Sequence, residues 1–244
     1  MPDLPFQRST WSRPGFLARC AIASGIAILL YLPTVRFGFA YDDASVVESH
    51  PQVTGHLWGA ILTSPYHVGE YVRVPTRLYR PLTIASLAAN HAVSGLNPWS
   101  YHLVNVLLHT LAASLVLALA LELGLTAGAA LVSALAFAVH PVHVEAVANV
   151  AGRAELLSTV FALLALIAYL RGRLVTLACL LGTALLAKEN VVTIFGVIAL
   201  WEALRPTPVG RSGLSARTRA AVMPLLATAA PIAAYLAEIG RAHV

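Results

Sequence analysis

The feature that most constrains the fold of this chain is a succession of long apolar runs. These runs cover residues 16–35, 101–121, 129–139, 154–170, 174–187, 191–204 and 220–237. A helix of about 20 apolar residues crosses a bilayer. Only 11% of the residues are charged, whereas a soluble domain carries about 25%. The sequence therefore predicts an all-α polytopic membrane protein with about seven transmembrane helices.

The distribution of charge predicts the direction of these helices. If the N-terminus is cytoplasmic, segments 1–19, 122–127, 171–173 and 205–219 lie inside, and segments 36–100, 140–153 and 188–190 lie outside. Lys and Arg are then roughly three times denser inside, as the positive-inside rule requires. Most carboxylates and histidines fall outside. Segment 36–100 becomes a large first non-cytoplasmic loop with short interfacial helices, one of them amphipathic over 81–93.

A polar cluster within 140–155 is the first candidate site. It contains His140, His143, Glu145, Arg153 and Glu155, and it is enclosed by two apolar runs. Ionisable groups near a bilayer are costly and usually functional. The alternative is an ordinary solvated loop. Pro141 indicates that a helix begins here, because proline is favoured in the first turn.

Two further charged pairs fall on the predicted outer face. Asp42-Asp43 follows the first apolar run, and Lys188-Glu189 separates the runs 174–187 and 191–204. Each of these two runs would rise about 21 Å as a helix, which is short of the ~30 Å hydrocarbon thickness. The sequence leaves open two short helices or one long broken helix.

These residue types suit transfer chemistry on a lipid-linked substrate. A carboxylate of Asp42-Asp43 can act as general base on an acceptor hydroxyl. Arg153 and Lys188 suit a phosphate, one through a planar fork and one as a point charge. Their alternative roles are ion pairs with Glu155 or Glu189, and snorkelling towards headgroups.

The histidines permit simpler explanations. His140 and His143 are three residues apart and could share a metal, but two imidazoles are too few, and the sequence favours no metal site. His102, Asn105 and His109 share one helix face, and for His109 we expect an interhelical hydrogen bond. Cys20 and Cys179 are expected to be small buried apolar residues, unpaired and not metal ligands.

Five ordered motifs carry a family resemblance. They are Phe39-Ala-Tyr-Asp-Asp43, Tyr79-Arg-Pro-Leu-Thr83, Tyr101-His-Leu-Val-Asn105 with His109, Phe137-Ala-Val-His-Pro-Val-His-Val-Glu145 with Gly152-Arg-Ala-Glu155, and Ala187-Lys-Glu-Asn190. Over about residues 30–205 the chain resembles the membrane half of the transmembrane tetratricopeptide-repeat O-mannosyltransferases and their bacterial relatives. These belong to the GT-C superfamily of membrane glycosyltransferases.

The resemblance implies an inverting hexosyltransferase with a polyprenyl-phosphate sugar donor and a protein or glycan acceptor. Asp42-Asp43 matches the acidic pair of the first loop, with Asp42 favoured as the base. Arg153 and Lys188 would lie near the lipid phosphate. The pocket would be shaped by His140, His143, Glu145, Glu155, Glu189, Arg80 and His102. Asn190 departs from the family pattern, in which a small residue such as Ser is expected. No cofactor is expected beyond the donor substrate.

The predicted boundaries are a cytoplasmic tail over 1–15 and a GT-C-like transmembrane domain over 16–237. Residues 238–244 resemble a translated sequencing adapter, so we expect an N-terminal fragment that lacks the C-terminal repeats and is inactive alone. The expected location is a bacterial inner membrane, or the endoplasmic reticulum in a eukaryote. Nucleic acid is not an expected partner. A secondary transporter and a non-catalytic membrane scaffold remain the alternatives.

Overall fold

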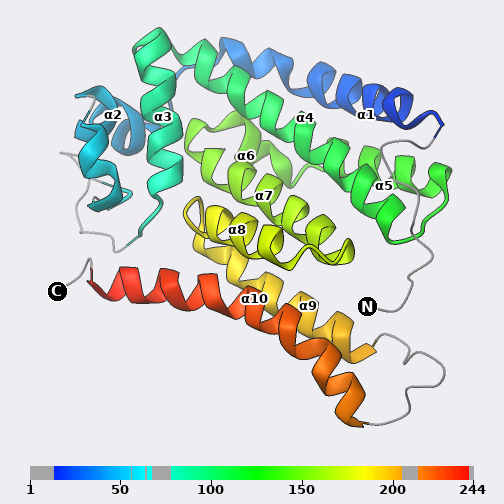
Figure 1. Cartoon of the computed structure of the whole chain (residues 1–244). Helices are drawn as coiled ribbons and strands as arrows, with labels where there is room; N and C mark the ends of the chain where they lie inside the picture. The colour runs from blue at the N-terminus through cyan, green and yellow to red at the C-terminus, as the bar shows by residue number, and fades with distance from the viewer. Residues whose placement is uncertain (1–13, 56, 64, 68–77, 205–213, 242–244) are drawn as a thin grey trace.

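The computed structural model describes residues 14–55, 57–63, 65–67, 78–204 and 214–241. All regular elements in these residues are helical (Figure 1). The predicted all-α class is therefore confirmed.

The helices follow the apolar runs closely. In chain order they are α1 Phe16–Tyr31, η2 Leu32–Arg36, η3 Ala44–Glu48, α2 Pro51–Thr54, η4 Trp58–Thr63, α3 Pro81–Ser94, α4 Pro98–Glu122, α5 Ala127–Val139, α6 His143–Ala148, η5 Val150–Gly152, α7 Arg153–Leu170, α8 Leu174–Leu185, η6 Glu189–Val192, α9 Thr193–Leu204 and α10 Leu214–Arg241. Seven of them, α1, α4, α5, α7, α8, α9 and α10, occupy the seven predicted runs. Prolines stand in the first turns of α3 and α4, where a missing N–H costs nothing.

Four segments in the described part of the chain are long and apolar enough to cross a membrane. They are Phe16–Arg36, Pro98–Glu122, Val150–Leu170 and Ala221–Ile239, whereas α5 and α8 are shorter apolar helices. Large apolar side chains also face outward: Leu17, Leu29 and Val175 are 78%, 73% and 79% exposed. Such a surface is unfavourable in water and suits contact with lipid. The chain is a multi-pass membrane protein.

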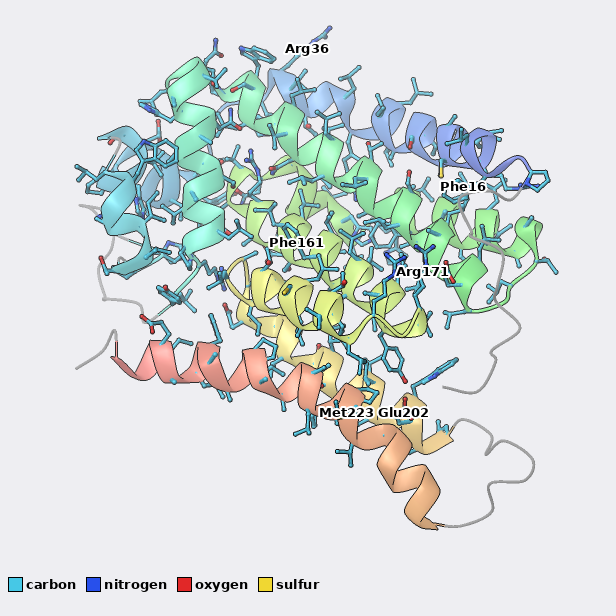
Figure 2. The ribbon with its side chains drawn as sticks, in the orientation of Figure 1. Phe16, Arg36, Phe161, Arg171, Glu202 and Met223 are labelled. Carbon is cyan, nitrogen blue, oxygen red and sulfur yellow. The ribbon has the colours of Figure 1, made fainter. Side chains whose placement is uncertain are left out.

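The bundle is built on α4 and α7. Helix α4 packs against α1, α5 and α7, and α7 packs against α8, which contacts α10 (Figure 1). Phe16 and Arg171 lie towards one end of the bundle and Arg36 towards the other (Figure 2). Consecutive long helices therefore run in opposite directions, and the loops after α1, α5 and α8 lie near one another.

The region 174–204 forms two helices, which answers the question left open by the sequence. Helix α8 ends at Leu185, Lys188 is extended (φ −159°, ψ 138°), and a single 3-10 turn precedes α9. Lys188 and Glu189 therefore lie in a connection between helices. Because an extended residue cannot continue a helix, one uninterrupted crossing is excluded.

The described part of the first loop folds against α3. Val46, Val47, Val53, Ile61 and the α3 residue Leu87 belong to one buried apolar cluster. The helix predicted over 81–93 is present as α3. This cluster gives the loop a fixed position beside α3, because burial of apolar area stabilises it by about 25 cal/mol per Å².

One cysteine prediction is wrong. Cys20 and Cys179 are both free, as expected, but Cys179 is exposed on α8 and only Cys20 is half-buried. Sequence hydrophobicity cannot distinguish a lipid-facing side of a helix from a side that faces protein, because both are apolar.

A buried arginine joins three helices at the loop end of the bundle. Arg153 begins α7 and is 1% exposed. Its Nε donates to Asn105 Oδ1 (2.5 Å), and its Nη2 donates to Asn90 Oδ1 (3.1 Å) and to the Tyr101 carbonyl oxygen (3.0 Å). These partners lie on α3 and α4. A buried donor or acceptor that lacks a hydrogen-bond partner lowers the stability of the fold. This set of bonds therefore fixes the start of α7.

Replacing Arg153 with methionine should lower the free energy of unfolding by about 3 kcal/mol, because three buried acceptors lose their donor. Arg153→Lys should recover only part of the loss, since one ammonium cannot reproduce the planar fork. Thermal unfolding of the detergent-solubilised protein measures both. Arg173→Met, at an exposed arginine, is the matched control and should change stability by less than about 0.5 kcal/mol. Equal stability of the two methionine variants would contradict the conclusion that the hydrogen bonds of Arg153 stabilise the fold.

Candidate active site

A polar pocket forms where the first loop meets α6 and the start of α7. Its volume is about 210 Å³. The first loop contributes four lining residues, α6 with its flanking residues contributes six, and α7 contributes one. The lining residues are Asp42, Tyr66, His67, Arg80, Val142, Glu145, Ala146, Asn149, Ala151, Gly152 and Glu155. Three carboxylates, a guanidinium and an imidazole thus share one small cavity.

The two adjacent aspartates have different environments. Asp43 is fully buried, and its Oδ1 accepts a hydrogen bond from the Ala151 amide (2.7 Å) and its Oδ2 from the Ala40 amide (3.0 Å). Burial raises the pKa of Asp43, although the backbone N–H groups oppose the shift. Asp42 is exposed and lines the pocket. Within the described residues its carboxylate has no hydrogen bond or ion pair, so this group is free to meet a substrate.

The backbone before Asp42 explains why the two carboxylates differ. Tyr41 has φ of +50°, an uncommon conformation for a residue with a side chain. A π-helical turn over Ala44–Glu48 follows directly, with Asp43 as its N-cap residue. Strained backbone and π turns are often found at functional sites. Here they separate one aspartate, which is bound to backbone, from its neighbour in the pocket.

Two cations reach the pocket in ion pairs. The Arg80 guanidinium donates from Nη2 to Glu189 Oε1 (2.7 Å) and from Nε to Glu189 Oε2 (3.0 Å). It also lies 4.7 Å from the centroid of the Tyr66 ring, a cation–π contact. Burial opposes ionisation of Glu189, but the hydrogen bonds from Arg80 hold its pKa below the usual range. Lys188 pairs with Glu155.

The structure divides the predicted site residues into two groups. Asp42, Arg80, Glu145 and Glu155 line the pocket, and Lys188 and Glu189 are joined to it through ion pairs. Asp43 is held by backbone beside it. These seven come from three separate regions of the chain: the first loop, α6 with the start of α7, and the connection between α8 and α9.

The other predicted residues do not line the pocket. Arg153 is buried with its donors directed to Asn90, Asn105 and Tyr101, so it is not available to a phosphate. His102 is buried, with Nε2 3.4 Å from the Gly38 carbonyl oxygen.

His140 and His143 also lie outside the pocket lining. His140 is exposed, and the ring of His143 packs against Phe137 with a centroid separation of 4.3 Å. Among the described residues, no group of three or more His, Cys, Asp or Glu side chains is gathered closely enough to hold a metal ion. The interhelical hydrogen bond expected for His109 is present, between its Nε2 and the Ala138 carbonyl oxygen (3.1 Å).

Sequence reasoning missed Tyr66, His67 and Asn149. Tyr66 and His67 lie in the long loop, where no periodicity indicates which side chains turn inward. Asn149 follows Glu145 by four residues across α6 and its C-cap, and this helical spacing was a usable signal.

Gly152 brings the backbone after α6 into close contact with that helix. A Cβ at this position would lie 2.2 Å from the Ala146 carbonyl oxygen. Gly152 and Ala146 both line the pocket, so this close approach sets the shape of one wall.

Comparison with known proteins gives a consistent set of relatives. The chain is 33% identical over 203 residues to "Protein O-mannosyl-transferase TMTC2" of Mus musculus. The aligned region covers 74% of this chain and 23% of the relative. It is 37% identical over 212 residues to Tmtc1 of Drosophila melanogaster (80% and 24%) and 30% identical over 206 residues to TMTC3 of Homo sapiens (76% and 22%). The chain thus spans about a quarter of the length of the curated relatives it matches. No family model and no solved structure matches it.

Gly152→Ala should lower the melting temperature of the solubilised protein, because the new methyl group must displace the Ala146 backbone; overpacking of this kind costs about 1–3 kcal/mol. Gly128→Ala is the matched control. A Cβ at Gly128 on α5 meets nothing within 4 Å, and alanine favours helix, so stability should stay the same or rise. Equal melting temperatures for the two variants would contradict the close packing at Gly152.

Proposed function

This chain is a relative of the TMTC protein O-mannosyl-transferases over three quarters of its length, and from that premise we propose that it forms the catalytic part of a membrane glycosyltransferase. The proposed reaction moves a hexosyl group, with mannose first among the candidates, from a polyprenyl-phosphate donor to an acceptor hydroxyl of a protein or glycan on the non-cytoplasmic face. The proposed domain spans residues 16–237, and the proposed location is a bacterial inner membrane.

The single observation that carries this proposal is the carboxylate of Asp42, which has no hydrogen bond or ion pair to any described residue and lines a pocket beside two cations. In an inverting transfer, a carboxylate takes the proton of the acceptor hydroxyl as its oxygen attacks the anomeric carbon. The bond from that carbon to the phosphate oxygen breaks, and the polyprenyl phosphate leaves with the electron pair. Asp43 is unsuited to this role because both its oxygens already accept backbone hydrogen bonds.

Arg80 and Lys188 are the proposed phosphate-binding groups. A guanidinium provides two parallel donors to phosphate oxygens, and an ammonium provides a compact charge. Both are now paired with carboxylates, Glu189 and Glu155. We propose that a donor phosphate binds between these cations and shares them with the carboxylates. Arg153 has a supporting role in this proposal, because it fixes the start of α7 beside Glu155.

Asp42→Asn in the intact protein should reduce kcat for sugar transfer by about 100-fold or more, since the amide cannot accept the hydroxyl proton. Expression and melting temperature should not change, because Asp42 is exposed. Asp43→Asn is the comparison and should instead lower the melting temperature, since an amide has only one acceptor oxygen for two backbone N–H groups. Radiolabelled transfer from polyprenyl-phosphate mannose measures activity. Wild-type transfer by Asp42→Asn would remove Asp42 from the mechanism.

Lys188→Met should raise the KM for the donor by about tenfold and should affect kcat less. The lost charge-assisted bond to the phosphate is made both in the bound ground state and in the transition state, so its loss weakens binding more than it slows the reaction. Lys188→Arg retains the charge and should recover most of the affinity. Saturation curves with polyprenyl-phosphate mannose separate the two constants. An unchanged KM in Lys188→Met would limit Lys188 to its ion pair with Glu155.

A further inference from the structure

Hydrogen bonds that link the Asp42 backbone carbonyl, the Ser45 hydroxyl and the His67 ring determine the tautomer of His67. Ser45 Oγ donates to the Asp42 carbonyl oxygen (2.9 Å), and His67 Nδ1 lies 2.9 Å from the same Ser45 Oγ. A hydroxyl has one hydrogen, and Ser45 has already donated it. His67 must therefore donate from Nδ1, which leaves the lone pair on Nε2. His67 lines the pocket together with Asp42.

The neighbours of His67 fix its position. The ring of Tyr66 meets the His67 ring edge to face, with centroids 4.6 Å apart. The Tyr66 amide donates to the Leu78 carbonyl oxygen (2.8 Å), and its hydroxyl donates to the Ala151 carbonyl oxygen (3.2 Å). Tyr66, the residue directly before His67, is thus tied to Leu78, which precedes α3, and to Ala151 in the turn before α7. These bonds help to give His67 the fixed geometry that a proton-transfer group requires.

We propose that His67 is the proton acceptor for Asp42, an inference that rests on the proposed transferase function. The acceptor hydroxyl gives its proton to the Asp42 carboxylate as the glycosidic bond forms. The Asp42 carboxyl then passes that proton to Nε2 of His67, and the imidazolium releases it to water at the mouth of the pocket. Asp42 is restored as a carboxylate for the next turnover, and no other reactant is consumed.

The surrounding charges are suited to this transfer. An imidazole is ordinarily a stronger base than a carboxylate, so a proton on the carboxyl group moves to the ring. Burial lowers the pKa of His67, Asp42 opposes this, and Arg80 adds to it. The net lowering of the His67 pKa favours the neutral ring, which is the form that can accept a proton. The other titratable groups around it are His50 and Tyr66 in the loop, and Glu145 and Glu155 in the pocket lining.

The pH profile of kcat in the intact protein tests the proposal with His67→Asn. Asparagine can still donate to Ser45, but it has no titrating nitrogen. Wild-type kcat should fall as the pH drops through the pKa of His67, which burial holds below the ordinary imidazole value, because a protonated His67 cannot accept a proton. His67→Asn should reduce kcat at pH 7.5 by about 10- to 100-fold, remove this acidic limb and leave the donor KM unchanged. Ser45→Ala should reduce kcat less and keep the limb.

Matched measurements separate this proposal from its premise. His91→Asn, on α3 and outside the pocket lining, should match the wild type at every pH. If wild type transfers mannose and His67→Asn has the same kcat and profile, the proton-acceptor role is overturned and the proposed function stands. If wild type transfers no sugar from any polyprenyl-phosphate donor, both are overturned.

A measurement on the wild-type protein covers the case in which His67→Asn does not fold. Nitrogen-15 NMR of histidine-labelled protein at pH 8, with the His67 signal assigned, reports which ring nitrogen carries the hydrogen. Hydrogen on Nδ1 supports the proposal. Hydrogen on Nε2 overturns it, because Nε2 would then have no lone pair with which to accept the proton.

Discussion

Everything at the polar end of this bundle depends on buried polar groups that are bonded across elements far apart in sequence. Asp43 joins the first loop to the Ala151 amide, and Arg153, two residues later, joins the same turn to α3 and α4. In a low-dielectric environment, a buried polar group without a partner destabilises the fold by more free energy than a hydrogen bond contributes to its stability. These bonds therefore determine where the first loop meets the turn before α7, and the pocket lies where these two segments meet.

The same requirement assigns different roles to neighbouring residues. The fully buried Asp43 must be hydrogen-bonded, and two backbone N–H groups satisfy it, whereas the carboxylate of the adjacent Asp42 is exposed and lines the pocket. Arg153 and Arg80 differ in the same way. One has neutral partners at depth, and the other pairs with a half-exposed carboxylate at the pocket. Residue type alone does not distinguish structural from functional charge; burial and partners do.

The sequence predicted the helices well, because apolar runs of membrane length leave the backbone few alternatives. Helix α3 begins at Pro81 as predicted, whereas α4 begins at Pro98, three residues before the predicted run at 101. The extended Lys188 resolved what the apolar pattern between 174 and 204 could not. The site was predicted in part. Asp42, Arg80, Glu145 and Glu155 line the pocket, but Arg153, His102, His140 and His143 do not. Polar patterns show that a side chain needs partners, and only the packed structure shows whether protein already supplies them.

The ion pairs at the pocket have a consequence for any anionic ligand. Arg80 and Lys188 each face a carboxylate now, so they stay in place when no ligand is bound and do not extend into solvent. Glu145 and Asp42 add further negative charge nearby. A phosphate that carries a single negative charge, such as a lipid phosphodiester, can share two cations with two carboxylates at moderate repulsion. The four carboxylates outnumber the two cations, so a dianionic phosphate would meet about twice the net repulsion that a monoanion meets. In the proposed reaction, this charge balance would favour binding of the diester donor over the monoester product and would assist product release.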